Sequence, residues 1–406
     1  MDKEYKTLEN NKIHVGDALE VLKTFPDNQI DMCITSPPYW GLRDYGVDGQ
    51  LGLEPNFNDY INRLCTIFDE VKRCLKDSGT CWVNIGDGYA SGAGSLNTNK
   101  GDSFHGGNKK HRTQTGIKAK NLPPKSLIGI PFRFALEMIN RGWILRNTII
   151  WYKPNCMPSS VKDRFTVDFE YLFFFSKNKK YYFEQQFEPV KQESIDRINQ
   201  NSFESQEGGA KDYGKNGVNP NRSMRKTLEN FKKNFTGKRN KRTVWKITTK
   251  PYKGAHFAVF PPELIETPIK AGCPEFICNE CGKPRIKLYK KTGFSNEGNE
   301  VINRSKAINL KEGSPQERIR KLNGKSYKKV EFLSDELSDC GCNAGFHQGI
   351  VLDPFIGSGT TAAVAKSLGR NYIGIELNPD YLDLIKNRVN ETIRPLESFI
   401  KAKEGD

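Results

Sequence analysis

With 406 residues and a formal net charge of +15, the chain is long enough for two or three domains and is strongly basic. It contains no run of about 18 apolar residues, and its first residues, MDKEYKTLENNK, lack the apolar core of a secretory signal, so neither a membrane span nor secretion is expected. We therefore expect a cytoplasmic protein with a polyanionic partner, above all nucleic acid, whose ten cysteines are thiols or metal ligands rather than disulfides.

The first ninety residues show alternating strand and helix patterns. Short apolar runs predict strands, and apolar residues that recur on one face predict helices. The predicted elements are a strand at 13–15, a helix at 18–24, a strand at 30–35, a helix at 60–75 and a strand at 80–85. Strands that alternate with helices of this length indicate a parallel sheet with crossover helices.

The strand at 30–35 ends at Ser36, Pro37, Pro38 and Tyr39. Two successive prolines can neither continue a ladder nor enter a helix interior, so the strand has to stop there. A rigid polar tip beside an aromatic residue is a candidate functional site, and an ordinary Pro-Pro turn is the alternative.

The middle of the chain is less regular. Residues 91–121 are rich in Gly, Asn, Ser and Lys, and we expect a loop that could order on a ligand. The next predicted elements are a helix at 131–140 and strands at 145–152 and 170–176. Between the two strands lies the sequence Lys-Asp-Arg-Phe, in which Arg164 can contact nucleic-acid phosphates, although a solvated loop explains it equally well.

Residues 184–243 form a polar, basic stretch with few long apolar patterns. Between Arg222 and Arg242, lysine and arginine are interleaved with Phe231 and Phe235, and Glu229 is the single acid. The candidate nucleic-acid contacts in this stretch are Arg222, Arg225, Lys232, Lys233, Arg239 and Arg242. Solubility is the alternative explanation, but charge that served only solubility would not need to be concentrated in this way.

A cysteine-bearing insertion at 275–346 separates two regular α/β pieces. Cys278-x-x-Cys281 followed by glycine is half of a zinc knuckle, and Cys340-x-Cys342 can supply the second half. Four thiolates within one insertion favour a structural, tetrahedral zinc site over unrelated free thiols. Zinc would hold the ends of the insertion together and keep the glycine-rich turn that follows in place.

The segment GIVLDPFIGSGTTAAVAKSLGRNYIGIELN, residues 349–378, is the most informative part of the chain. It predicts, in order, a strand at 350–352 ending at Asp353, a glycine-rich turn at 355–359, a helix at 360–368 and a strand at 372–375 closed by Glu376. Glycine lets the backbone approach a ligand closely, and an acid at the end of the second strand suits ribose hydroxyls.

This turn differs from a pyrophosphate site. A dinucleotide site usually carries G-x-G-x-x-G around the helix start, whereas this helix opens Thr360-Thr361-Ala362, and Asp353 would repel phosphate. S-adenosylmethionine, a cofactor with a ribose and a cationic amino-acid moiety, fits better.

The sequences DPFIGSGTT and TSPPYW together resemble the amino-methylating DNA methyltransferases, which methylate the exocyclic nitrogen of cytosine or adenine. The catalytic tip precedes the cofactor turn, an order that resembles the beta group of this family. The resemblance covers residues 12–90, 125–183, 243–274 and 349–392. It implies an α/β fold, a circularly permuted Rossmann-like methyltransferase sheet, here with a basic insertion and a small zinc-binding insertion.

The resemblance also assigns roles to the catalytic tip. The Ser36 hydroxyl and the Pro37 carbonyl would accept hydrogen bonds from the target amino group and so aim its lone pair at the methyl donor. Pro38 would keep the tip rigid, and Tyr39 would stack on a base that has been flipped out of the duplex.

The cofactor-binding residues that the resemblance implies are Asp17, Phe260, Asp353, Phe355, Gly357, Ser358, Gly359, Thr360 and Glu376. Glu376 would bind the ribose hydroxyls, and Asp17 would approach the adenine amino group. Two of these residues have structural alternatives, because Asp17 can be a helix N-cap and Phe260 can be a core residue.

A serine at the first position of the tip resembles the cytosine-N4 enzymes, so we favour cytosine-N4 and keep adenine-N6 as the alternative. Methylation at cytosine C5 is disfavoured, because that reaction needs a nucleophilic cysteine, usually after proline, and no cysteine here follows a proline. If the chain were a non-catalytic DNA-binding protein, we would expect a damaged proline tip or a damaged glycine-rich turn, but both motifs are intact. Methylation of RNA or of a small molecule would leave the tip beside a polybasic insertion without a role.

We therefore expect a site-specific methyltransferase that acts on double-stranded DNA, with a cognate restriction endonuclease as a candidate partner. The expected organisation is a catalytic half at 1–183, a basic target-recognition region at 184–243, a cofactor-binding half at 244–274 and 347–406, and the cysteine-bearing insertion at 275–346. Phosphate contacts in the basic region would supply affinity, and polar side chains there would read the bases.

Overall fold

The structure, a computed structural model, describes residues 8–42, 44–90, 122–193, 238–249, 260–292 and 329–392, without the side chains of 287–292 and 329–336. The chain divides into two compact units. The first consists of Met1–Gln186, Arg242–Arg285 and Cys340–Asp406, and the second of Phe187–Lys241 and Ile286–Asp339. The predicted loop at 91–121 lies outside the described residues.

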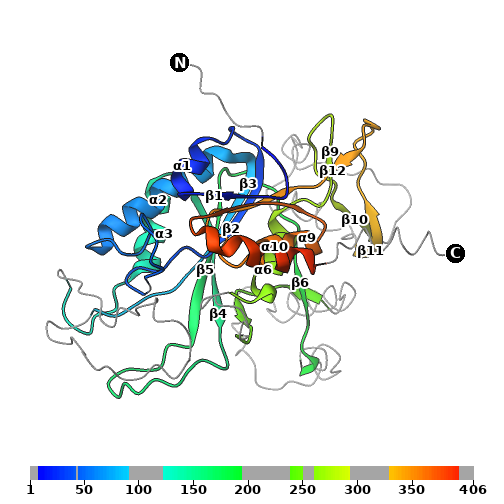
Figure 1. Cartoon of the computed structure of the whole chain (residues 1–406). Helices are drawn as coiled ribbons and strands as arrows, with labels where there is room; N and C mark the ends of the chain where they lie inside the picture. Colours follow the sequence, from blue (N-terminus) through cyan, green and yellow to red (C-terminus); the bar gives the residue numbers. More distant parts are fainter. Residues whose placement is uncertain are drawn as a thin grey trace, which may run out of the picture. The chain divides into compact units, whose positions relative to one another are not determined.

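An eight-stranded sheet forms the centre of the first unit (Figure 1). From edge to edge its strands are β1 (Lys12–Val15), β14 (Asn371–Glu376), β13 (Ile350–Asp353), β2 (Ile30–Thr35), β3 (Leu75–Ile85), β5 (Phe169–Ser176), β4 (Ile144–Tyr152) and β8 (Val244–Lys246). All neighbouring strands are parallel except that β5 runs antiparallel to both β3 and β4. The predicted strands near the N-terminus are therefore confirmed as parallel, within a sheet that is mixed.

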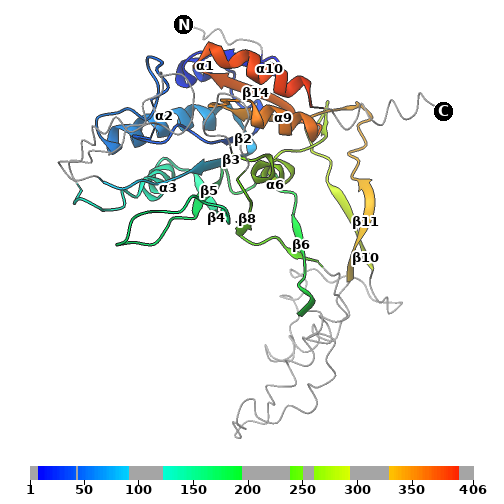
Figure 2. The same cartoon turned by 60° about the horizontal axis from the view of Figure 1, so that its bottom comes forward.

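Two strands from the C-terminal part of the chain, β14 and β13, lie between the N-terminal strands β1 and β2. β14 pairs with β1, and β13 lies between β14 and β2, where Val351 pairs with Met32 and Leu352 with Cys33. Figure 2 shows β14, in orange, next to the blue N-terminal elements. Parallel neighbours end at the same edge of a sheet, so the residues that follow β2, β13 and β14 come together there.

Helices cover both faces of the sheet. The first apolar cluster joins α1 (Ala18–Lys23), α2 (Phe57–Cys74) and α3 (Ile130–Asn140) to strand residues such as Cys33, Val83 and Phe173. The second cluster joins α6 (Pro262–Gly272), α9 (Thr360–Ser367) and α10 (Leu382–Asn390) to strand residues such as Met32, Ile34 and Trp82. All six residues of β2 are buried, which is typical of a parallel strand covered on both faces.

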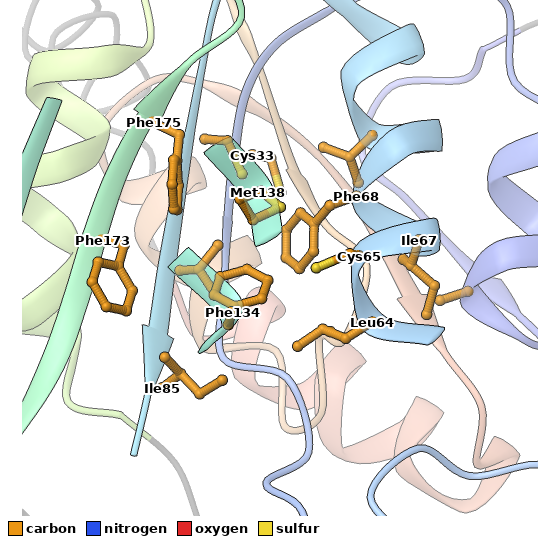
Figure 3. Packing of buried hydrophobic residues seen from close by; sticks show 14 of the residues in the cluster. Cys33, Leu64, Cys65, Ile67, Phe68, Ile85, Phe134, Met138, Phe173 and Phe175 are labelled. Atoms are coloured by element: carbon orange, nitrogen blue, oxygen red, sulfur yellow. The ribbon is translucent and has the colours of Figure 1, made fainter. Parts of the chain in front are cut away.

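Figure 3 shows the first cluster from close by. Phe68 of α2 and Phe134 of α3 pack with their ring centroids 5.4 Å apart, and Phe134 also meets Phe175 of β5 edge-on. The start of α3 is fixed by Asp87, whose carboxylate accepts hydrogen bonds from the backbone N–H groups of Gly129 and Ile130. Asp87 lies two residues beyond the end of β3, so this bond ties α3 to the edge of the sheet where the strands end.

The predicted helices and strands up to β5, and those around the glycine-rich turn, agree with the structure to within a few residues, except that β3 begins at Leu75. Helix α6 was not predicted, because it begins with proline and contains Pro268. The first unit also contains a 3-10 turn, η2 (Pro379–Tyr381), and a two-residue pairing of β9 (Ile277–Cys278) with β12 (Phe346–His347).

The second unit is described only in part. Its antiparallel pairs are β6 (Phe187–Pro189) with β7 (Lys238–Asn240) and β10 (Lys287–Thr292) with β11 (Lys329–Leu337).

Candidate active site

A cavity of about 650 Å³ opens in the first unit, at the edge where β2, β13 and β14 end. It is lined by twelve of the predicted catalytic and cofactor-binding residues: Asp17, Ser36, Pro37, Pro38, Tyr39, Phe260, Asp353, Phe355, Gly357, Ser358, Thr360 and Glu376. Gly359 caps the N-terminus of α9 immediately after this turn. The proline tip and the glycine-rich turn therefore face one common space.

The proline tip is held by neighbouring buried residues. The Tyr60 hydroxyl donates a hydrogen bond to the Pro38 carbonyl at 2.9 Å, and the Trp40 indole donates to the Glu54 carbonyl at 2.9 Å. A Cβ atom at Gly86 would lie 2.7 Å from the Tyr39 ring, so this position accepts only glycine without moving the tyrosine. These contacts leave the tip little freedom before any ligand binds.

Tyr39 is fixed through its hydroxyl as well as its ring. The hydroxyl donates to Glu170 Oε2 at 2.8 Å, and the same oxygen accepts from Asn84 Nδ2 at 3.1 Å. Glu170 Oε1 is paired with Lys153. Burial, together with the Glu170 carboxylate, holds the pKa of Tyr39 well above its ordinary value, so the phenol stays protonated and remains a donor.

Asp353 joins the two halves of the site. Its Oδ1 accepts from the Thr35 hydroxyl at 2.5 Å and from the Phe355 N–H at 3.0 Å, and its Oδ2 accepts from the Thr361 hydroxyl at 2.5 Å. Thr35 is the last residue of β2 and lies 318 positions from Asp353 in the chain. Burial raises the pKa of Asp353 to about 6. The carboxylate therefore ties the residue before Ser36 to the start of α9.

Glu376 closes β14 and holds the glycine-rich turn. Its Oε2 accepts from the Gly357 N–H and its Oε1 from the Asn378 N–H, both at 2.9 Å. Burial raises the pKa of Glu376 to about 7, and the nearby Asp353 adds to this effect. A carboxylate has about four lone-pair positions, so both oxygens can still accept from a ligand in the cavity.

Asp17 is a helix N-cap, which was one of the two roles considered for it. Its Oδ1 caps α1 by accepting from the N–H groups of Leu19 and Glu20, and its Oδ2 lies 3.7 Å from Arg63. Asp17 also lines the cavity, as does Arg63. Phe260 lines the cavity and also packs against the second apolar cluster.

Thr360 and Ser358 differ in their hydrogen bonding. Among the described residues, the Thr360 hydroxyl is one of three buried side-chain polar atoms without a hydrogen-bond partner. The Ser358 hydroxyl accepts from Arg388 at 2.9 Å. A buried hydroxyl without a partner is costly unless a ligand satisfies it, so the Thr360 hydroxyl is a candidate ligand contact.

Several residues of the cavity were not predicted. Asn84 lies near the end of β3, Lys153 follows β4, Glu170 lies near the start of β5, and Asn378 and Tyr381 follow β14. The sequence did contain an indication that Asn84 belongs to the site. Asn84 lies just before Gly86-Asp87, where a predicted strand ends, and polar residues at the ends of parallel strands meet at the same edge of the sheet. The pair Lys153 and Glu170 had no local indication, because it depends on the register of β4 against β5.

Comparison with known proteins identifies the family of this chain. Residues 30–279 and 333–387 match the model of the DNA methylase family of N6 and N4 methyltransferases. The chain belongs to this family. The resemblance found in the sequence is thereby confirmed, and the tip and the glycine-rich turn both fall within the matched ranges.

This methylase is similar to two curated Type II methyltransferases along most of its length. It is 36% identical to M.Cfr9I of Citrobacter freundii over 92% of this chain and 86% of that protein. It is also 36% identical to M.SmaI of Serratia marcescens over 96% of this chain and 95% of that protein. Among solved structures, the PvuII DNA methyltransferase (cytosine-N4-specific) matches with a TM-score of 0.47 and 17% identity, covering 97% of this chain and 92% of that chain.

The predicted DNA contacts of the methylase are described only in part. The Arg164 guanidinium lies over the Tyr89 ring at 3.6 Å, and Arg239 forms an ion pair with Glu188 at 2.8 Å. Arg242 accepts a hydrogen bond from the Trp245 indole at its carbonyl. The other four predicted contacts, Arg222, Arg225, Lys232 and Lys233, lie outside the described residues.

In the described part of the methylase, no helix is long and apolar enough to cross a membrane.

Proposed function

We propose that this DNA methylase transfers a methyl group from S-adenosylmethionine to the exocyclic N4 of a cytosine flipped out of duplex DNA. One observation carries the proposal: Ser36 and the turn that contains Gly357 line the same cavity, although they belong to opposite ends of the chain. The serine at the first position of the tip favours cytosine. Adenine N6 remains the second candidate, because the matched family includes both kinds of methyltransferase.

The residues of the cavity fit S-adenosylmethionine. Glu376 presents a carboxylate where ribose hydroxyls can donate to it, and the Thr360 hydroxyl is available to a polar ligand group. Phe260 and Phe355 supply apolar surface for the adenine ring and the aliphatic chain. Asp353 already accepts three hydrogen bonds, so we assign it to holding the turn and the tip together. When bound, the cofactor supplies an electrophilic methyl group on a positively charged sulfur.

The tip prepares the target nitrogen. An exocyclic amine is a poor nucleophile, because its lone pair is delocalised into the ring. In our proposal the Ser36 hydroxyl and the Pro37 carbonyl accept its two N–H bonds and favour a pyramidal nitrogen, at little entropic cost because the prolines are rigid. The Tyr39 ring, held by Glu170 and Gly86, stacks on the extruded base.

We also propose a division of labour along the chain. Residues 1–183 form the catalytic half, and 244–274 with 347–406 form the cofactor half of one permuted domain. The position of β13 and β14 between β1 and β2 supports the permutation. Residues 184–243 recognise the target, which the separate compact unit containing Phe187–Lys241 supports. Arg164, Arg222, Arg225, Lys232, Lys233, Arg239 and Arg242 contact DNA in this proposal, and a partner endonuclease would cut the same sequence when it is unmethylated.

The decisive experiment identifies the product. Purified protein is incubated with plasmid DNA and S-adenosylmethionine carrying a labelled methyl group, and the digested nucleosides are analysed by mass spectrometry. Label in N4-methylcytosine is the expected result. Label in N6-methyladenine would replace cytosine by adenine as the target, and unlabelled DNA from several sources would overturn the catalytic proposal.

Cofactor binding is expected to depend on pH through Glu376. Because the pKa of this buried carboxyl is about 7, most copies are protonated at pH 6 and ionised at pH 8. The ionised form is the better acceptor for ribose hydroxyls, so the Kd for S-adenosylmethionine should rise up to about 10-fold from pH 8 to pH 6. Calorimetry between pH 6 and pH 8 measures this Kd. The Glu376→Gln variant should bind S-adenosylmethionine weakly, with a Kd that does not change over this range.

Glu376 is expected to affect the stability of the fold in the opposite direction, with higher stability at low pH. Its pKa is raised above the ordinary value of 4.5, so the folded state holds the proton more tightly than the unfolded state. The contribution of Glu376 to stability is therefore present at low pH and is lost as pH rises through about 7. For cofactor binding, an affinity for S-adenosylmethionine that decreases toward high pH would contradict the assigned role of Glu376.

A further inference from the structure

Four thiols from two distant stretches of sequence meet in the first unit. The sulfur atoms of Cys278, Cys281, Cys340 and Cys342 all lie within 4.8 Å of one another. In a tetrahedral site with Zn–S bonds of about 2.3 Å the sulfur atoms are about 3.8 Å apart, so small side-chain rotations complete the geometry. We propose that these four thiolates bind one structural zinc ion, at a site separate from the cavity of the proposed methyl transfer.

The backbone around the cluster is already arranged for such a site. Cys278 pairs with Phe346 across β9 and β12, and its carbonyl accepts from the Gly282 N–H at 3.1 Å, which closes a tight turn. The turn therefore keeps Cys278 and Cys281 close to each other.

The two halves of the cluster are also held together by Asn279. Its N–H donates to the Gly345 carbonyl at 3.1 Å, and its side-chain amide donates to the Ala344 carbonyl at 3.0 Å. Its side-chain oxygen lies 2.8 Å from His347 Nδ1. The first cysteine pair is thus placed opposite the second by contacts that do not involve the sulfur atoms.

The location of the cluster explains why a metal is useful there. The chain leaves the first unit after Arg285 and returns at Cys340, so the cysteines flank both crossings. β9 and β12 have only two residues each, which is too short to anchor a long excursion. A metal that closes a long loop removes much of the entropy of the unfolded chain.

The returning chain leads directly into the cofactor half. Two residues after β12, the Gly349 N–H donates to the Pro274 carbonyl at 3.2 Å, and the Ile350 N–H then donates to Asp31 at 2.9 Å as β13 begins. β13 ends at Asp353, which holds the glycine-rich turn. Zinc would therefore fix the point from which the cofactor-binding strand starts. With four protein sulfur ligands it would have no open position, which is typical of structural sites.

The test begins with the metal content of the unmodified full-length protein. After dialysis against buffer without metal, elemental analysis should find about one equivalent of zinc per chain. Protein produced with cobalt should show the sulfur-to-cobalt charge-transfer and tetrahedral ligand-field absorption of a four-sulfur site. Cys281→Ser and Cys342→Ser should each retain less than about 0.2 equivalents, while Cys156→Ser, a half-buried cysteine outside the cluster, should retain the full amount.

Removal of zinc by a strong chelator should lower the thermal midpoint of the wild-type protein and leave that of Cys281→Ser unchanged. The proposal would be overturned if the wild-type protein held less than half an equivalent of zinc and mass spectrometry found all four thiols freely reactive or linked as disulfides. Metal analysis needs no methyl transfer, so this result is independent of whether the proposed activity is correct.

Discussion

Ser36→Ala is expected to reduce kcat by about 100- to 1,000-fold and to leave the Kd for S-adenosylmethionine within about two-fold of wild type. In the proposed reaction the hydroxyl accepts a hydrogen bond from the target amine, and this bond is most valuable when the nitrogen becomes pyramidal. In the same proposal the cofactor is held by the turn and Glu376, which also line the cavity. Single-turnover kinetics and calorimetry with the same protein preparation measure the two quantities.

Two controls separate this role from a structural one. The Ser36 hydroxyl also interacts with the Tyr39 side chain, so its loss could act by loosening the ring. Tyr39→Phe keeps the ring and removes the phenol, and it should cost less than about 10-fold if the ring alone stacks on the base. Ser126→Ala, which changes a half-buried serine outside the cavity, should have wild-type kinetics. A Ser36→Ala enzyme with nearly normal kcat would refute the assigned role.

Gly357→Val is expected to weaken S-adenosylmethionine binding by about 100-fold. Gly357 has a φ of 52°, in the left-handed region that a β-branched residue strongly disfavours, and its N–H donates to Glu376. A valine side chain would distort the turn and project from a residue that lines the cavity. At saturating cofactor, kcat should recover to a larger fraction of wild type than it does in Ser36→Ala.

The matched control is Gly369→Val. Gly369 has a φ of 70°, so valine there is similarly strained, but the residue follows α9 and is not among those that line the cavity. This variant should lose thermal stability and keep its cofactor affinity. Equal loss of affinity in both glycine variants would mean that general destabilisation, rather than the geometry of the turn, explains the result.

Sequence reasoning found the parts of the site whose chemistry is local. Prolines that end a strand and glycines that start a helix restrict their own backbone, so Ser36 and Gly357 could be selected without knowledge of the fold. The network around Tyr39 could not be found in this way. Trp151 pairs with Glu170 only because β5 runs antiparallel between β3 and β4, and this register brings Lys153 and Asn84 to the same carboxylate.

Asp353 shows a second limit of sequence reasoning. Its position before the glycine-rich turn predicted a cofactor contact, and the structure places it on the cavity. Its three hydrogen bonds, however, run to Thr35, Phe355 and Thr361. The bond to Thr35 depends on β13 and β2 being neighbours, which is a property of the sheet order and not of either motif. The DNA contacts predicted for the basic segment have no such comparison with the structure, because most of the segment lies outside the described residues.

The strand order has a consequence during synthesis. While the ribosome is still making the first 349 residues, β2 and β1 lack the neighbours that β13 and β14 provide later. A nascent chain therefore exposes apolar strand edges until β13 and β14 emerge, and such edges invite aggregation. A product that ended before β13 would have the proline tip without Asp353, Gly357 and Glu376, so its cavity would lack these lining residues.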